Sequence, residues 1–142
     1  YSVTGVQTCA LPILRAGFST AFYTDPHLQI MTAVSLNWDD IVFGISASGN
    51  IRDTVKSIEV ASDSGAYTVA ITGGIGSRIV SVSKETIYVA QGGHETGIPW
   101  LQPRVCQLAV IQLLLEKSIK LRNGTMQTLE KVDRTLDKKR YL

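Results

Sequence analysis

Short apolar runs alternate along this chain with segments in which apolar residues recur at helical spacing. The short runs predict buried β-strands at residues 19–23, 41–45, 67–72 and 86–90. The segments of helical period predict α-helices at residues 25–36, 51–65, 99–121 and 126–136. Little helix is expected between the glycines that follow residue 72 and the next strand. This alternation predicts an α/β fold, a doubly wound parallel sheet with flanking helices.

Several of the predicted helices have recognisable ends. Asp25 is a preferred N-cap residue and Pro26 a preferred first residue, so a helix is expected to begin there. Gly65 ends the next helix, and Asn123-Gly124 separates the last two. The helix at residues 99–121 is apolar on most of its faces, which predicts burial against both the sheet and a second surface.

The stretch from Asp40 to Thr54 is the most informative. An apolar strand passes through Ser46, Ser48 and Gly49 into the start of a helix. In a doubly wound sheet ligands bind at the carboxyl ends of strands, and a helix N-terminus attracts anions through its free N–H groups and its dipole. The segment has no P-loop lysine, and no Gly-x-Gly-x-x-Gly follows the strand. A single phosphate on a small molecule therefore fits better than a nucleotide.

Composition narrows the class of protein. The 142 residues are 44% hydrophobic and 18% charged, as expected for one soluble globular domain. A formal charge of +2 is too small to indicate nucleic acid as the partner of this domain. The longest apolar run is too short to span a bilayer, and no cleavable signal pattern opens the chain. Cys9 and Cys106 show neither metal-site spacing nor a disulfide framework, which suits a reducing cytosol.

Candidate catalytic chemistry is sparse. A nucleophile elbow needs Gly-x-Ser-x-Gly, but Gly44-Ile-Ser-Ala-Ser48 ends in serine, so serine hydrolysis is not indicated. His94 and Glu95 lie in a glycine-rich loop, where they are general acid–base groups, ligand contacts or solvated loop residues. No second histidine follows His94 at zinc spacing. We therefore assign no catalytic residue, no metal and no cofactor.

Residues 1–13 fit none of the predicted elements. Pro12 stands where a helix would lead into residues 14–17, and proline inside a helix costs on the order of 3 kcal/mol. The run from Ser2 to Ile13 also resembles a translated sequencing-adaptor tail; the alternative is a divergent first element. We expect residues 1–13 to be non-native or unassigned and the domain to occupy residues 14–142.

Four segments in order resemble one protein family. Residues 43–55, Phe-Gly-Ile-Ser-Ala-Ser-Gly-Asn-Ile-Arg-Asp-Thr-Val, resemble the Ser-x-Ser-Gly-x-Thr signature of sugar isomerase (SIS) domains. Residues 23–29, 65–72 and 104–111 are similar to segments of one SIS subgroup, the RpiR-type transcription regulators. The resemblance covers almost everything from residue 14 to residue 142.

The resemblance implies a flavodoxin-like sheet, commonly a homo-oligomer, that binds a phosphorylated sugar or amino sugar in the cytoplasm. In such regulators a separate N-terminal helix-turn-helix domain binds DNA. Neither that domain nor the family's first strand is found in this sequence, and that strand is central in the family's 2-1-3-4-5 order. We therefore expect a chain truncated at its N-terminus and poorly stable when isolated.

The resemblance also places a phosphosugar site on the serine-rich turn. The residues that it assigns are Ser46, Ala47, Ser48, Gly49, Asn50, Ile51 and Thr54. Ile51 stands where the family has threonine, so one hydroxyl contact is lost; such a charge-assisted bond is worth about 1.5–3 kcal/mol. The alternative is an ordinary turn with serine caps, in which Thr54 is only helix surface.

Three functions remain open at this point. The favoured one is an SIS domain that senses a phosphosugar for a transcription regulator and does no chemistry. The second is an SIS enzyme, such as an aldose–ketose isomerase, that uses His94 or Glu95 as its base. The third is an inert dimerisation remnant.

Overall fold

The computed structural model describes residue 10 and residues 12–90, 101–122 and 124–137. The chain divides into two compact units. The sheet unit is Tyr23–Gln107, and the helical unit combines Tyr1–Phe22 with Leu108–Leu142. Each unit is described by itself. Among the described residues, no helix is long and apolar enough to cross a membrane.

The described part of the sheet unit contains three parallel strands, β1 (Ile41–Ile45), β2 (Tyr67–Thr72) and β3 (Glu85–Tyr88), in the order β1-β2-β3. Gly44 of β1 lies opposite Ala70 of β2, which in turn lies opposite Thr86 of β3. Only β2 is buried along almost its whole length, because it has a strand on each side. The parallel sheet with flanking helices confirms the predicted fold class.

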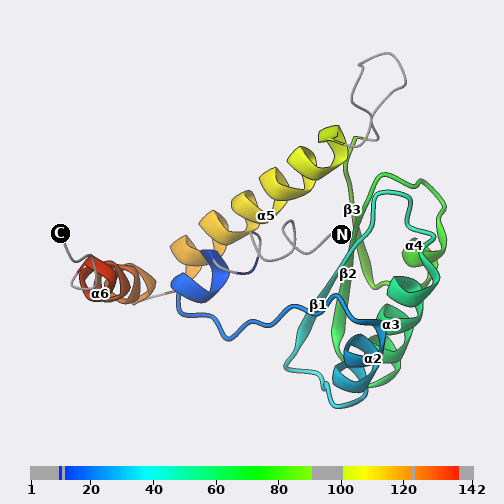
Figure 1. Ribbon diagram of the computed structural model, residues 1–142, viewed down its shortest axis with the longest axis horizontal. Coiled ribbons are helices and arrows are strands. Elements are labelled where there is room, and N and C mark those ends of the chain that lie inside the picture. The colour runs from blue at the N-terminus through cyan, green and yellow to red at the C-terminus, as the bar shows by residue number, and fades with distance from the viewer. Residues whose placement is uncertain (1–9, 11, 91–100, 123, 138–142) are drawn as a thin grey trace. The chain divides into compact units, whose positions relative to one another are not determined.

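Three helices of the sheet unit lie on one face of this sheet: α2 (Pro26–Val34), α3 (Arg52–Asp63) and α4 (Arg78–Val82) (Figure 1). A core of Ile58, Ala70 and Ile79 joins α3, β2 and α4. Gly44 is required at this face, because a Cβ there would lie 2.7 Å from Cγ1 of Ile58. The close approach seats α3 directly on β1.

The predicted start of α2 is confirmed. Asp25 is its N-cap residue, and the Asp25 carboxylate accepts the N–H groups of His27 and Leu28 at 2.9 and 3.0 Å. Pro26 is the first helical residue, where its missing N–H costs nothing. The helix ends at Val34 rather than near residue 36.

The prediction of a strand at residues 19–23 is wrong. Residues 18–24 have neither helical nor strand structure. A short run of strand-forming residues becomes a strand only when a neighbouring strand bonds to it. In the part of the chain that the structure describes, β2 is the only strand that pairs with β1, and residues 19–23 pair with none.

Two further predictions need correction between residues 73 and 90. A short helix, α4, forms at Arg78–Val82, where little helix was expected. Burial explains it, because Ile79 is completely buried in the core with Ile58 and Ala70. The third strand is Glu85–Tyr88 rather than residues 86–90.

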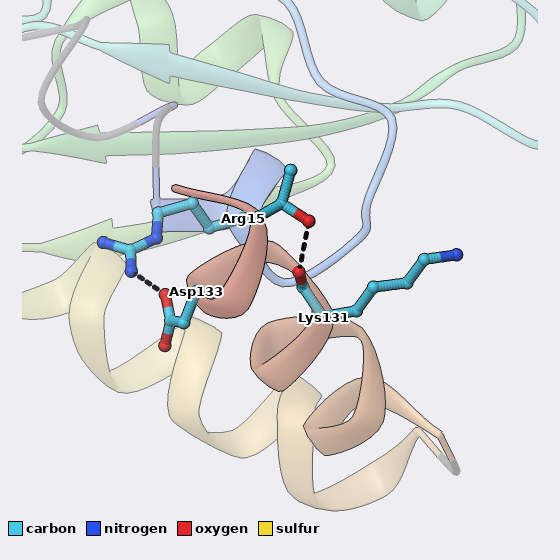
Figure 2. A network of polar contacts seen from close by, with 4 residues as sticks. Arg15, Lys131 and Asp133 are labelled. Atoms are coloured by element: carbon cyan, nitrogen blue, oxygen red, sulfur yellow. Dashed lines mark hydrogen bonds and ion pairs between the residues drawn. The ribbon is translucent and has the colours of Figure 1, made fainter. Parts of the chain in front are cut away.

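The helical unit contains α6 (Thr125–Asp137) and the larger part of α5 (Leu101–Leu121), together with a helical turn at residues 12–15. An ion pair joins Arg15 to Asp133 on α6 (Figure 2). The Arg122 guanidinium lies 4.7 Å from the centre of the Phe18 ring and donates to the Gly17 carbonyl at 3.0 Å. These polar contacts link the turn to α5 and α6.

Two-sided burial of the long helix was predicted and is not found within the described chain. On α5, Ile111 and Leu115 are buried, whereas Val105 and Leu113 are more than half exposed. Residues 99 and 100, which the prediction included, lie outside the described residues.

Candidate functional site

The serine loop, residues 46–51, joins the carboxyl end of β1 to the start of α3 (Figure 1). Ser46 Oγ accepts the Gly49 N–H at 3.0 Å, and Ser48 Oγ accepts the Asn50 N–H at 3.3 Å. Gly49 has a φ of +67°, which favours glycine over any residue with a Cβ. The loop is therefore a tight turn stabilised by its own two hydroxyls.

The two serines have different surroundings. Ser46 is 3% exposed, and its hydroxyl is occupied in holding the turn. Ser48 is exposed, as are its neighbours Ala47 and Asn50. Of the two predicted hydroxyl contacts, the one at Ser48 is therefore open to a ligand, while the one at Ser46 shapes the loop beneath it.

A second loop, which we call the glycine loop (residues 73–77), follows the neighbouring strand β2. It packs directly on the serine loop. A Cβ at Gly49 would lie 2.7 Å from the Ser77 Cβ, and a Cβ at Gly74 would lie 2.9 Å from the Ser48 carbonyl carbon. Both separations are shorter than real Cβ contacts, so the two backbones approach this closely only because both positions are glycine.

Hydrogen bonds also join the segments that follow β1 and β2. The Gly73 N–H donates to the Ala47 carbonyl at 3.1 Å, and the Ile79 N–H donates to the Gly49 carbonyl at 2.9 Å. The Asn50 side-chain carbonyl accepts the Arg78 N–H, at 3.0 Å, at the start of α4. Asn50 thus has a structural partner in addition to its predicted ligand role.

The helix that leaves the serine loop presents free backbone donors. Ile51 is the N-cap residue of α3, and its side chain makes no capping hydrogen bond. In a helix of 12 residues the first-turn N–H groups, here those of Arg52 to Thr54, have no partner within the helix. These donors and the helix dipole attract an anion, whereas the carboxylate of Asp53 in the same turn opposes it.

The two remaining predicted ligand contacts, Ile51 and Thr54, offer fewer polar groups to a ligand. Ile51 is 54% exposed and presents an apolar side chain where a threonine would present a hydroxyl. Thr54 is half-buried in the first turn of α3. Both residues therefore lie at the start of α3, close along the chain to Ser48 and Asn50.

The sequence analysis missed Ser77. Its side chain is 7% exposed, and its Oγ has no hydrogen-bond partner. A signal was available, since Gly73-Gly-Ile-Gly-Ser77 follows a predicted parallel strand, and loops at that edge of neighbouring strands meet. The contribution of this loop could therefore have been anticipated from the strand order.

The other candidates do not extend the site. His94 and Glu95 lie outside the described residues. In the part of the chain that the structure describes, no group of three or more histidine, cysteine, aspartate or glutamate side chains is placed to hold a metal ion. The site, as far as it is described, is an anion-attracting turn with hydroxyl and amide donors.

The chain is similar to known proteins in sequence and in fold. Residues 15–117 match the model of a family described as the SIS domain. An uncharacterized HTH-type transcriptional regulator of Caldanaerobacter subterraneus subsp. tengcongensis is 31% identical over 104 residues, which are 73% of this chain and 37% of that protein. The chain thus spans less than half the length of this curated relative.

Solved structures share the fold. The Vibrio vulnificus NanR protein, complexed with ManNAc-6P, superposes with a TM-score of 0.83 at 19% identity, over 96% of this chain and 52% of that one. The sugar isomerase domain of an RpiR transcription factor from Sphaerobacter thermophilus gives a TM-score of 0.75 at 24% identity, over 93% of this chain and 72% of that one. At these identities the likeness supports the architecture of the chain.

Proposed function

The chain belongs to the SIS domain family, and from this premise we propose that it is the phosphosugar-binding, effector-sensing domain of a sugar-responsive transcription regulator. The similarity to an HTH-type transcriptional regulator supports the regulatory context. The fold shared with the NanR protein, which was solved with ManNAc-6P, supports a phosphorylated sugar or amino sugar as the ligand class.

One observation carries the proposal: an exposed serine hydroxyl next to the uncapped N-terminus of a three-turn helix. In the proposed complex the phosphoryl group accepts hydrogen bonds from Ser48 and from the free N–H groups of Arg52 and Thr54. Asn50 has its side-chain NH₂ left to donate, since its carbonyl is bonded to Arg78. Gly49 lets the serine loop pack closely on Ser77 of the glycine loop, and buried Ser46 holds the turn beneath the ligand.

Ile51 stands where the family has threonine, and this difference lowers the affinity that we expect for a phosphosugar. A threonine hydroxyl would add one charge-assisted hydrogen bond to phosphate, worth about 1.5–3 kcal/mol. Without it we expect binding weaker by about tenfold or more than in a family member that carries the threonine. The backbone donors of α3 do not depend on that side chain, so the site remains functional.

The wider biology follows from the regulator context. The domain would act in the cytoplasm as part of a homo-oligomer, and it would reach DNA only through a separate helix-turn-helix domain. Ligand binding alone is proposed, without a cofactor. Isomerisation would need a base, and the candidates for that role, His94 and Glu95, lie outside the described residues.

Isothermal calorimetry tests the proposal. The chain is titrated with fructose 6-phosphate, glucosamine 6-phosphate and N-acetylmannosamine 6-phosphate, each against the unphosphorylated sugar. At least one phosphorylated sugar should bind, its parent sugar should not, and Ser48→Ala should weaken binding by about tenfold. Ser64→Ala is the matched control, because Ser64 caps the other end of α3 and its hydroxyl bonds to the Val34 carbonyl.

Two results would refute the proposal. One is that none of the three phosphosugars binds. The other is that binding is unchanged in the double variant Ser46→Ala, Ser48→Ala, provided that circular dichroism shows the variant to be folded.

A further inference from the structure

A groove lies beside the serine loop, between α3 and α4. Its volume is about 570 Å³, within the range of small-molecule sites. Val55 and Val82 give it apolar surface. Its charged lining residues are Arg52, Lys56 and Glu59 of α3 and Arg78 of α4. The groove therefore combines an apolar wall with three cations and one carboxylate.

The positive charge of the groove is not balanced from within. The Lys56 ammonium pairs with the Glu59 carboxylate at 2.8 Å. Neither Arg52 nor Arg78 has a carboxylate within ion-pair distance among the residues described. Arg78 lines the same groove as this ion pair. The hydrogen bond and charge of Lys56 lower the pKa of Glu59, and the charge of Arg78 adds to this effect. Two guanidinium groups are thus left for an external anion.

The groove is continuous with the serine loop through Asn50. This residue belongs to the loop and also lines the groove. Its side chain accepts the backbone N–H of Arg78 at 3.0 Å, which fixes the start of α4 against the loop. Arg52 also serves both regions, because its N–H is one of the free donors of α3 and its side chain lines the groove.

We propose that this groove binds a second anionic group, phosphoryl or carboxylate, of the same sugar phosphate whose first phosphoryl group lies at the serine loop. The inference rests on the proposed function and narrows its ligand class to sugar phosphates with two separate anionic groups, which we call doubly anionic. The planar guanidinium groups of Arg52 and Arg78 can each donate two parallel hydrogen bonds to either anion. Val55 and Val82 contact the carbon chain between the two charged ends.

Calorimetry with two matched ligand pairs on the full chain tests the inference. The first pair is fructose 6-phosphate and fructose 1,6-bisphosphate, and the second is glucose 6-phosphate and 6-phosphogluconate. In at least one pair the doubly anionic ligand should bind about tenfold tighter than its partner. An advantage confined to the bisphosphate assigns the groove to a phosphoryl group, and one confined to 6-phosphogluconate assigns it to a carboxylate.

Charge variants then locate the second group. Arg78→Gln should abolish the advantage and leave the monophosphate affinity unchanged, because only the backbone of Arg78 bonds to Asn50. Arg78→Lys should restore part of it. Lys84→Gln removes the same charge before the first residue of β3, at the opposite edge of the sheet, and should keep the full advantage.

The failures of the two proposals are distinguishable. If the monophosphates bind and the doubly anionic ligands bind no tighter, the inference is wrong and the proposed function stands. The same holds if the advantage persists in the double variant Arg52→Gln, Arg78→Gln, with its fold checked by circular dichroism. If no sugar phosphate binds at all, both proposals are overturned.

Discussion

The serine loop and the glycine loop follow neighbouring parallel strands, but they contribute different groups to the site. The serine loop exposes Ser48 and leads into a helix with free N–H donors. The glycine loop buries its serine, Ser77, and packs on the serine loop through the backbone of Gly74 and the side chain of Ser77. We infer that the first loop supplies the ligand contacts and the second fixes where those contacts stand.

Each loop has one buried serine, and the two serines differ in whether the hydroxyl has a hydrogen-bond partner. Ser46 and Ser77 are both nearly inaccessible, at 3% and 7% exposure. The Ser46 hydroxyl accepts a hydrogen bond from Gly49, while the Ser77 hydroxyl has no partner. A buried hydroxyl that is satisfied stabilises its turn, whereas one that is not costs desolvation energy.

The largest expected effect concerns the contact between the loops. Gly49→Ala should lower the free energy of unfolding by about 2–5 kcal/mol, because the new methyl group clashes with Ser77 and the backbone remains left-handed. Gly76→Ala is a matched control: its φ of +68° is nearly the same, but no atom lies within 4 Å of the new methyl. It should cost only about 1–2 kcal/mol. Equal losses in urea unfolding would show that the loops do not constrain each other.

The next prediction compares the two buried serines. Ser46→Ala should lower the free energy of unfolding by about 1–3 kcal/mol, because the buried Gly49 N–H loses its acceptor. Ser77→Ala should leave it unchanged or raise it by up to about 1 kcal/mol, because an unsatisfied hydroxyl is removed. Both changes are measured by chemical denaturation. If Ser77→Ala lowered the free energy of unfolding more than Ser46→Ala does, our assignment of the satisfied and the unsatisfied hydroxyl would be wrong.

A smaller effect is expected at the side chain that bridges the two segments. Asn50→Ala should lower stability by about 1 kcal/mol, since the Arg78 N–H loses its acceptor. Asn50→Asp keeps an acceptor and should keep stability, but its negative charge should weaken phosphosugar binding by about tenfold. Thermal melts and calorimetry separate these outcomes. Unchanged binding in Asn50→Asp would remove Asn50 from the anion site.

The smallest effect lies outside both loops. The hydrogen bond and charge of Lys56 hold the pKa of Glu59 below its usual 4.5, so this ion pair stabilises the fold above that pH. The contribution is lost as the pH falls through the lowered pKa of the folded protein. Between about pH 6 and pH 3 the parent chain should therefore lose slightly more stability than Lys56→Gln. Identical pH profiles in urea unfolding would mean that the exposed pair contributes nothing.

Local patterns predicted the elements that depend on local chemistry. The Asp25-Pro26 start of α2 and the strands β1 and β2 were predictable because a cap and an apolar run are complete within a few residues. The helix α4 was not, because its formation depends on the burial of Ile79 against Ile58 and Ala70 from distant parts of the chain. The strand expected at residues 19–23 failed for the converse reason, since a strand needs a neighbour that sequence periodicity cannot supply.

The site shows the same division. The Ser-x-Ser-Gly pattern predicted a turn at the helix start, and the structure places its residues there. The sequence did not distinguish accessible Ser48 from buried Ser46. Both positions are serine, so the residue type does not indicate which of the two side chains faces solvent. Nor did it indicate that Gly74 is constrained by the Ser48 carbonyl group.

The central claim is that a phosphoryl group binds at the serine loop, and amide NMR tests it most directly. The ¹⁵N-labelled chain is titrated with each hexose 6-phosphate and with the parent sugar. The account predicts saturable shifts that are largest at the N–H groups of residues 48–54 and absent with the unphosphorylated sugar. Shifts that centre on other residues, or the same shifts with the parent sugar, would contradict it.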